Sequence, residues 1–254
     1  MICIDLSEKV AVITGGTGEL GKMMARTIAS AGGNVAICYG RNENQALKLK
    51  SEIQELGVNC IAVGVDVTDK NSVLLMRDEV FRRMGSADII VNSAVIQYKW
   101  KHVLDQPLED YESQFRSSVL HNVLMAKAFL PAMIKRGWGR FIGINSECAM
   151  ECHENQSAYV SGKRGMDGML RVLAREVGGH GITVNQVAPG WTISENRPSE
   201  KSAAEKAYIS KVPLKRRGDS QEIANVVAFL ASDLAGYITG AYIPVCGGNV
   251  MATI

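Results

Sequence analysis

The sequence predicts an α/β fold, a doubly wound parallel sheet of about seven strands with helices on both faces. Short, continuously apolar runs such as VAVIT at 10–14 alternate with longer segments of helical apolar spacing. Strands that are apolar at every position are buried on both faces, which is typical of parallel sheets covered by helices. A glycine-rich stretch, TGGTGELG at 14–21, links the first strand to the first helix. This order indicates a dinucleotide-binding sheet of the Rossmann type.

Apolar runs of strand length predict the strands, and apolar residues at three- and four-residue spacing predict the helices. Glycines such as Gly33 and Gly57 end the first two helical segments. Strands are expected at 10–14, 34–39, 59–67, 87–94, 139–146, 181–190 and 240–245. Helices are expected at 20–32, 44–56, 70–85, 107–136, 157–178 and 219–232. No linker or repeat interrupts this alternation, so we expect one cofactor-binding and catalytic domain over residues 1–254.

Composition and charge exclude several classes of partner. The 254 residues carry 28 basic and 26 acidic side chains, with a net charge of +2. No like-charge run reaches five residues, so neither nucleic acid nor a membrane is an expected partner. The six cysteines are scattered without a Cys-x-x-Cys pair, which indicates small buried residues in a reducing compartment and no metal site. Charges within the first ten residues argue against a signal peptide, so we expect a cytoplasmic protein.

The stretch 14–21 fits two glycine patterns. Residues 16–21 read Gly-x-Gly-x-x-Gly, the general dinucleotide pattern, whereas 14–21 nearly read Thr-Gly-x-x-x-Gly-x-Gly, with Glu19 at a glycine position. Between a strand and a helix, the backbone N–H groups of such a loop and the helix dipole can hold a pyrophosphate. In the second pattern, we expect Gly18 to supply the close backbone approach, and Glu19 to begin the helix with its side chain turned away.

The end of the second strand bears on the choice of cofactor. The general pattern expects an acid there, to bind the ribose 2′-hydroxyl. The sequence instead reads CYGRN, with Tyr39 and Arg41, and the first acid is Glu43, which we expect to open the next helix. A basic residue without an acid favours a 2′-phosphate, so NADP(H) is the preferred cofactor and NAD(H) remains possible. Arg41 could alternatively be an exposed loop charge.

Three residues form a candidate catalytic group. Tyr159 and Lys163 stand four apart on a predicted helix, and therefore on one face. A nearby ammonium favours the phenolate, so we expect the pKa of Tyr159 to fall from about 10 towards neutrality. Such a phenol can exchange a proton with a carbonyl or alcohol oxygen. Ser146 ends the fifth strand, where its hydroxyl can hydrogen-bond that oxygen.

With these motifs in order, the chain resembles the short-chain dehydrogenase/reductase family along nearly its whole length. The carrying segments are TGGTGELG, DVTD (66–69), VNSAV (91–95), the Ser146, Tyr159 and Lys163 group, VNQVAPGWTIS and YITGAYIPVCGG. The resemblance implies hydride transfer, with Tyr159 as general acid/base, Lys163 on the nicotinamide ribose and Ser146 orienting the substrate. The cofactor contacts then expected are Gly15, Thr17, Gly18, Leu20, Gly21, Tyr39, Arg41, Asp66, Val67, Asn92, Ala94, Tyr159, Lys163, Pro189, Gly190, Thr192 and Ser194.

Four positions depart from the family pattern. Glu19 and Val95 each replace a glycine, and Cys246 replaces an aspartate, where we expect an effect on packing or a subunit contact. Ser118 falls where the family has a catalytic Asn that holds a water relay to the lysine. We count Ser118 as a catalytic position, with Asn122, one helical turn later, as a possible stand-in.

The substrate side carries fewer signals. Residues 97–102, 147–156 and 191–212 should surround the pocket, and 191–212 resembles the mobile lid of the family. Gln97, Glu147, His153 and Trp191 are candidates for contact with a polar substrate, although each could be a rim residue. His121 is expected to be packed or at an interface rather than a base.

Two functional hypotheses follow. The first is an NADP(H)-preferring oxidoreductase for a carbonyl/alcohol pair, resembling either a 3-oxoacyl-thioester reductase or a sugar or polyol dehydrogenase. The second is a catalytically degenerate nucleotide-binding sensor or scaffold, which Glu19, Val95 and Ser118 would explain. The intact Ser146, Tyr159 and Lys163 set favours the enzyme. The resemblance also implies a homotetramer built through two long helices and the last strand.

Overall fold

A single parallel sheet organises the part of the chain that the computed structural model describes, residues 3–195 and 198–251. Its strands run in the order β3-β2-β1-β4-β5-β6-β7, and every pair of neighbours is parallel. The prediction of a doubly wound parallel sheet is confirmed. The strands are β1 (Val10–Thr14), β2 (Asn34–Tyr39), β3 (Cys60–Gly64), β4 (Ile89–Asn92), β5 (Gly139–Ile144), β6 (Ile182–Pro189) and β7 (Tyr242–Val245).

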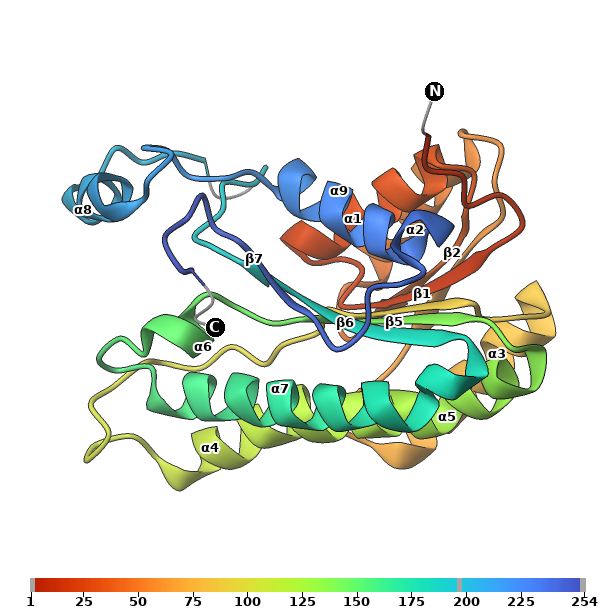
Figure 1. Cartoon of the computed structure of the whole chain (residues 1–254), viewed down its shortest axis with the longest axis horizontal. Helices are drawn as coiled ribbons and strands as arrows, with labels where there is room; N and C mark the ends of the chain where they lie inside the picture. Colours follow the sequence, from red (N-terminus) through yellow and green to blue (C-terminus); the bar gives the residue numbers. More distant parts are fainter. Residues whose placement is uncertain (1–2, 196–197, 252–254) are drawn as a thin grey trace.

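Helices cover both faces of the sheet, as Figure 1 shows. On one face lie α1 (Glu19–Ser30), α2 (Glu43–Gln54) and α9 (Ser220–Ala231). On the other lie α3 (Lys70–Met84), α4 (Leu108–Phe115), α5 (His121–Arg136) and α7 (Ser157–Val177). A π-helical turn, Arg116–Leu120, joins α4 to α5 without a break, so the long helix predicted at 107–136 has a local bulge.

The core is divided into two layers by the alternation of side chains along each strand. Within β1, Ala11 and Ile13 face the layer under α1, α2 and α9, whereas Val12 faces the layer under α3, α5 and α7. Phe141 on β5 and Phe129 on α5 are fully buried in this second layer. Truncation of either ring to alanine is expected to cost about 3–5 kcal/mol of folding free energy.

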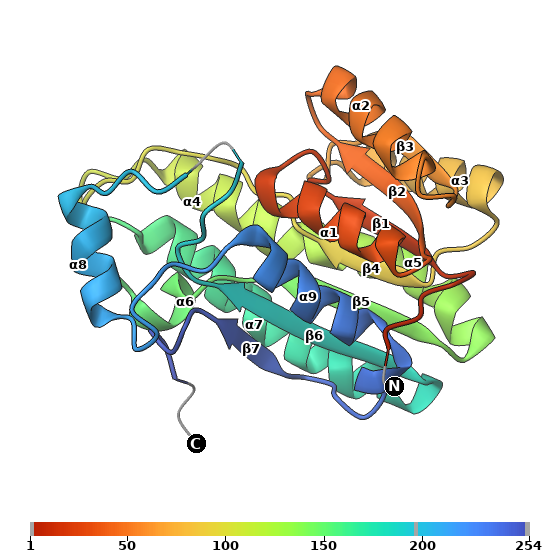
Figure 2. The ribbon, with the colours of Figure 1, turned by 90° about the horizontal axis from the view of Figure 1, so that it is seen from above.

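The sheet order places a topological switch between β1 and β4. Because the connections from the two strands lead to opposite edges of the sheet, a crevice opens outside their carboxyl ends. Two short helices, α6 (Cys148–Glu151) and α8 (Ala203–Lys211), lie at this same end (Figures 1 and 2). Neither was predicted as a helix. Within the predicted lid, 191–212, Ser202 caps α8 by accepting the Glu205 N–H at 3.2 Å, while residues 196–197 fall outside the described part.

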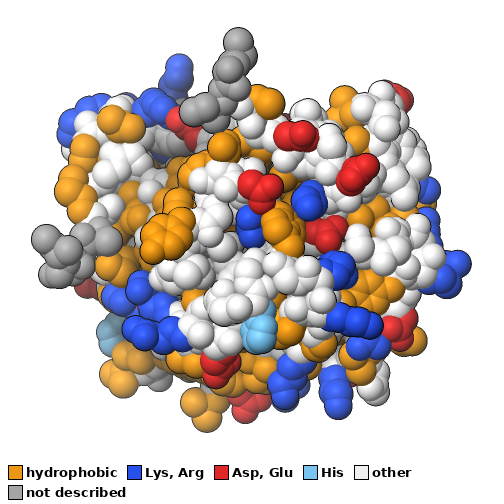
Figure 3. Space-filling model, turned by 45° about the vertical axis from the view of Figure 1, so that its right-hand side comes forward, with side chains coloured by type: hydrophobic (Ala, Val, Ile, Leu, Met, Phe, Trp, Pro, Cys, Tyr) orange, Lys and Arg blue, Asp and Glu red, His pale blue; other side chains and the backbone are white. Residues whose placement is uncertain are grey.

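One helical stretch of the described residues, Leu108–Arg136, is long and apolar enough to span a membrane by composition. Its most apolar window is 61% buried inside the protein, as in the core helix of a globular protein. On the molecular face in Figure 3, acidic and basic side chains are interspersed rather than gathered into one broad area of a single sign.

Candidate active site

The glycine loop after β1 packs against the end of β4. Gly15 has a φ of +64°, and a Cβ atom there would lie 2.8 Å from the Ala94 Cα. A Cβ on Gly21 would lie 2.2 Å from the Gly15 carbonyl oxygen. Thr14 Oγ1 accepts the Ser93 N–H at 3.1 Å. The loop backbone is therefore drawn tightly over the sheet edge, and only glycine fits at these two positions.

Glu19 is the first residue of α1, and Gly18 is its N-cap in an extended conformation. The Glu19 carboxylate pairs with the Lys22 ammonium at 3.2 Å, and its side chain is 25% exposed. A carboxylate in the first turn of a helix is favoured by the helix dipole. The expected start of the helix at Glu19 agrees with the structure, and its charge is balanced within the first turn.

The ends of β2 and β3 lie beside this loop. Arg41 is exposed, and Glu43 opens α2 as expected. Burial raises the pKa of Tyr39, and a hydrogen bond with Glu43 adds to the shift. Asp66 Oδ1 accepts both the N–H and the hydroxyl of Thr68, at 2.8 and 2.7 Å. Two acids near the loop are therefore already engaged, Glu43 with the Tyr39 hydroxyl and Asp66 with Thr68.

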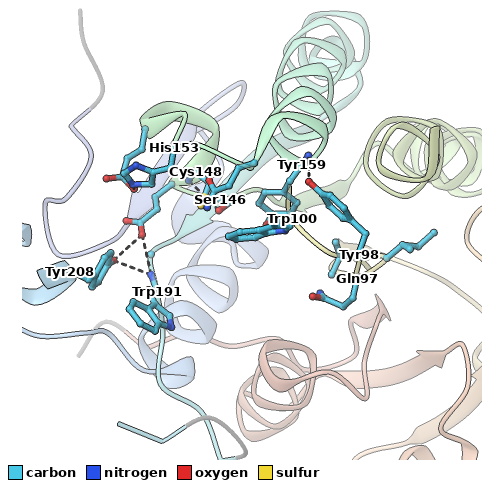
Figure 4. Close-up of a pocket in the computed structure, with 15 residues that line it drawn as sticks. Gln97, Tyr98, Trp100, Ser146, Cys148, His153, Tyr159, Trp191 and Tyr208 are labelled. Atoms are coloured by element: carbon cyan, nitrogen blue, oxygen red, sulfur yellow. Dashed lines mark hydrogen bonds and ion pairs between the residues drawn. The ribbon is translucent and has the colours of Figure 1, made fainter. Parts of the chain in front are cut away.

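Ser146, Tyr159 and Lys163 meet at the carboxyl edge of the sheet. Lys163 Nζ donates to the Ile144 carbonyl oxygen at 2.6 Å and lies 5.7 Å from the Tyr159 ring centroid. Ser146 and Lys163 are buried, and the Tyr159 N–H donates to the Tyr98 hydroxyl at 2.7 Å. Figure 4 shows Tyr159 and Ser146 on the wall of one cavity.

The protonation of this group differs from the expectation. Burial raises the pKa of Tyr159 to about 12, and hydrogen bonding with Ser146 only partly opposes this. Burial also lowers the pKa of Lys163 to about 8. The predicted fall of the Tyr159 pKa was wrong, because burial removes water from the phenolate and so raises the pKa.

The bulge between α4 and α5 holds a buried polar network. Asn122 Nδ2 donates to the Ser118 carbonyl oxygen at 2.6 Å, and Asn92 Nδ2 donates to Asn122 Oδ1 at 2.8 Å. The Ser118 hydroxyl is 3.2 Å from the position of a Cβ on Gly162, next to Lys163. Within the described residues, Ser118 Oγ and Asn92 Oδ1 are buried without a hydrogen-bond partner. Both atoms therefore have free capacity for a water or a ligand.

His121 follows this bulge and is fully buried. Burial lowers the pKa of its imidazole to about 4, and Nδ1 lies 3.1 Å from the Ser117 carbonyl oxygen. The expectation of a packed histidine agrees with these contacts.

A cavity of about 500 Å³ opens beside Ser146 and Tyr159. All four predicted substrate residues, Gln97, Glu147, His153 and Trp191, line it. In Figure 4, Trp191, Tyr208 and His153 lie on one side and Tyr98, Trp100 and Tyr159 on the other, with Ser146 between them. The cavity is also lined by Tyr98, Trp100, Glu151, Gln156 and Tyr208, which lie in the three segments expected to surround the pocket but were not singled out as substrate residues.

Glu147 connects the cavity wall to three other segments. Its Oε1 accepts the Trp191 N–H at 3.1 Å and the Tyr208 hydroxyl at 2.9 Å, and its Oε2 accepts Asn249 Nδ2 at 3.0 Å. The residue is 3% exposed, and burial raises the pKa of its carboxyl. Glu147 thus holds α8, the turn after β6 and the C-terminal segment at the end of β5.

The turn after β6 is also held from its other side. Arg217 donates to the carbonyl oxygens of Trp191 and Thr192, at 3.1 and 2.5 Å. The same guanidinium pairs with Glu205 of α8 at 3.0 Å, and both side chains are 2% exposed. A Cβ on Gly190 would lie 2.6 Å from the Tyr208 hydroxyl oxygen. Of the expected cofactor contacts, Pro189 ends β6, and Gly190 and Thr192 lie in the turn that α8 braces.

No cluster of three or more His, Cys, Asp or Glu side chains that could hold a metal occurs in residues 3–195 and 198–251. Cys246 is buried, and its sulfur accepts the Val250 N–H at 3.3 Å, which agrees with a packing role.

The fold and these groups define the class of protein. A Rossmann-type parallel sheet carries a glycine loop at its switch point and a Ser, Tyr and Lys group at the same edge. This is the arrangement of an NAD(P)-dependent oxidoreductase.

Comparisons with known proteins identify the family. A family model described as "Enoyl-(Acyl carrier protein) reductase" matches residues 17–249. The 3-oxoacyl-(acyl-carrier-protein) reductase FabG of Staphylococcus aureus is 33% identical, over 96% of this chain and 98% of its own length. The FabG of Pseudomonas aeruginosa is 34% identical over 98% of this chain and 100% of its own. The chain belongs to the short-chain dehydrogenase/reductase family.

A solved structure agrees in fold. The NAD⁺-bound xylitol dehydrogenase superposes with a TM-score of 0.89 and 27% sequence identity, covering 96% of this chain and 99% of its own. The predicted family, the fold class and the prediction of an NAD(P)-dependent enzyme are thereby confirmed.

Proposed function

We propose that this enzyme interconverts a carbonyl and a secondary alcohol with a preference for NADP(H). The observation that carries the proposal is the meeting of Ser146, Tyr159 and Lys163 beside a cavity of about 500 Å³ at the switch point of the sheet. A bound nicotinamide supplies or accepts the hydride. The residues of the chain position the substrate oxygen and move its proton.

Tyr159 is the proposed general acid/base, at its phenolic oxygen. In the direction of reduction, a phenol whose pKa is about 12 is fully protonated at neutral pH and can donate its proton to the carbonyl oxygen. Ser146, which hydrogen-bonds Tyr159, orients the same oxygen. Lys163 lies behind the ring, where a protonated ammonium stabilises the phenolate that proton donation leaves. Ser118, with its free hydroxyl beside α7, is the proposed holder of a relay water.

The loop residues fit a pyrophosphate, because α1 begins behind Gly18 without a side-chain cap, which leaves the N–H groups of its first turn for an anion. Gly15, Thr17, Gly18, Leu20 and Gly21 are the proposed phosphate contacts. Tyr39, Arg41, Asp66 and Val67 would hold the adenosine half, and Asn92, Ala94, Tyr159, Lys163, Pro189, Gly190, Thr192 and Ser194 the nicotinamide half. Arg41 is exposed at the end of β2, and Glu43 is engaged with Tyr39, which supports the preference for a 2′-phosphate.

We propose two substrate subclasses, after the relatives: a 3-oxoacyl thioester, and a sugar or polyol. Acceptor groups of Glu147, Glu151 and Gln156 line the cavity and suit the hydroxyl donors of a polyol. Residues 191–212 are the proposed lid, with α8 as its rigid part. We also propose, from the family resemblance, that the enzyme is cytoplasmic and forms a homotetramer. Exposed apolar side chains on the long helical face, Phe115, Leu120 and Val172, support association through that face.

The test is oxidation of NADPH and NADH across a panel of ketones, keto sugars and acyl thioesters, followed at the nicotinamide absorbance. Turnover with a several-fold advantage for NADPH would support the proposal. Cofactor binding without turnover of any carbonyl would support the sensor or scaffold instead.

A further inference from the structure

The substrate cavity presents hydrogen-bond acceptors and negative charge opposite its aromatic walls. Glu147, Glu151 and Gln156 line it, and its lining contains no Lys or Arg among the described residues. Tyr98, Trp100, Tyr159, Trp191 and Tyr208 supply aromatic rings. We propose, building on the proposed function, that the enzyme acts on carbonyl compounds or alcohols that carry a protonated amine.

Glu147 places a carboxyl group near the reacting end. It follows Ser146 directly and is 3% exposed, and its three protein partners are hydrogen-bond donors without charge: a backbone N–H, a phenol and an amide. None of the ion pairs found among the described residues includes Glu147. Buried carboxylates are normally paired with a cation, since burial without one is costly. A cation in the cavity would supply that pairing.

Gln156 gives an independent indication of a donor-bearing ligand. It is 7% exposed, it lines the cavity, and its amide interacts with the Cys148 thiol. Its Oε1 is buried, and in the described residues no donor reaches it. A ligand whose N–H or O–H donates to Oε1 would satisfy this acceptor.

The neighbouring charges leave the cavity negative. His153 Nε2 lies 2.9 Å from Glu151 Oε2, so a protonated His153 would cancel one of the two carboxylate charges. Arg217 stacks on Trp191 at 4.5 Å from its ring centroid, but Glu205 neutralises it. Lys163 lies behind Tyr159 and does not line the cavity. Glu147 therefore has no cationic partner among these side chains, and aromatic faces add attraction for a cation.

The test compares isosteric ketones that differ only in charge. Dimethylaminoacetone is paired with isobutyl methyl ketone, and 3-dimethylaminopropyl methyl ketone with isohexyl methyl ketone, so that two spacings are sampled. Levulinate is the anionic probe. Each is assayed with NADPH and with NADH. We expect kcat/KM for the amine to exceed that of its isostere by roughly tenfold or more in at least one pair, and levulinate to be the poorest substrate.

Variants assign the preference to the cavity. Glu151→Gln and Gln156→Met should each lower the ratio of amine to isostere at least about threefold. Glu154→Gln removes an acid from the same loop outside this cavity and should leave the ratio unchanged. A ratio near one in both wild-type pairs, or a ratio insensitive to Glu151→Gln and Gln156→Met, overturns the inference.

Failure of the proposed function gives a different result. If the isosteric ketones turn over and the amines do so no faster, the oxidoreductase stands and the amine preference is overturned. If no ketone turns over, calorimetric binding of the same pairs to the NADPH complex decides the amine preference separately. Tighter binding of the amine supports it, and equal binding overturns it.

Discussion

The two sides of the crevice are held together by different kinds of contact. On the cofactor side, close backbone packing dominates, with Gly15 against Ala94 and Gly21 against Gly15. On the substrate side, side chains from distant segments meet, as Glu147 does with Tyr208 and Asn249. The glycines of the first side can be recognised in one short stretch of sequence, although they pack against Ala94. The side-chain contacts of the second side follow no local pattern and join residues more than sixty apart. The glycine loop should therefore tolerate substitutions on the substrate side, whereas the turn after β6, which Glu147 also holds, belongs to both sides.

The largest effect is expected where the two sides meet. Tyr159→Phe should lower kcat about a thousandfold or more, because it removes the proton-transfer group. NADPH affinity should change less than about twofold, since the ring remains. Stopped-flow turnover and fluorescence titration of NADPH measure the two quantities.

Tyr111→Phe is the matched control. It removes a tyrosine hydroxyl that is hydrogen-bonded to Ser157 Oγ at 2.7 Å and lies outside the substrate cavity. Its kcat should stay within about threefold of wild type. A Tyr159→Phe enzyme with an unchanged rate would sink the mechanism.

Glu147 tests the substrate side by itself. Glu147→Ala leaves three buried donors without an acceptor, so the KM for substrate should rise about 10- to 100-fold with a smaller fall in kcat. Glu147→Gln keeps one acceptor oxygen and should restore part of the loss. Steady-state kinetics separate KM from kcat, and NADPH titration monitors the other side. An equal loss of NADPH affinity would show that the two sides are not independent.

Arg41 tests the cofactor side. Arg41→Ala should weaken NADPH binding about tenfold and leave NADH binding unchanged, because only the 2′-phosphate loses a charged partner. Titration of both cofactors measures this. Lys48→Ala, which removes an exposed charge from α2, is the control. Equal effects of Arg41→Ala on both cofactors would mean that Arg41 does not contact the 2′-phosphate.

The smallest effect is expected at Glu19. Glu19→Gly should change NADPH affinity less than about threefold, since its carboxylate already pairs with Lys22 in the first turn of α1. Tightening by orders of magnitude would instead show that the carboxylate opposes the pyrophosphate. The same titration as for Arg41 decides between these outcomes.

Much of the fold was predictable from the sequence because its signals are local. Apolar runs and helical periodicity predicted the seven strands in their order along the chain. Glu43 opens α2 as expected. The helices α6 and α8 were missed, since one is a single turn and the other lies in a polar segment whose periodicity is weak. The pKa of Tyr159 was predicted in the wrong direction because burial, which a sequence does not show, raises it.

In the candidate site, too, the sequence indicates some residues and not others. Gln156 stands three residues before Tyr159 at the start of one helix, and the expected pocket segment 147–156 included it without singling it out. Nothing in the local sequence indicates that Tyr208 reaches Glu147, or that Arg217 braces the turn after β6.

By itself, the sequence determined the sheet, the glycine loop and the spacing of Ser146, Tyr159 and Lys163, because backbone conformation and helical periodicity act over a few residues. Only the tertiary structure decided the burial of these groups, and with it their protonation. It also decided which acids and aromatic rings enclose the substrate. Desolvation and long-range contacts exist only once segments far apart in the chain have packed together.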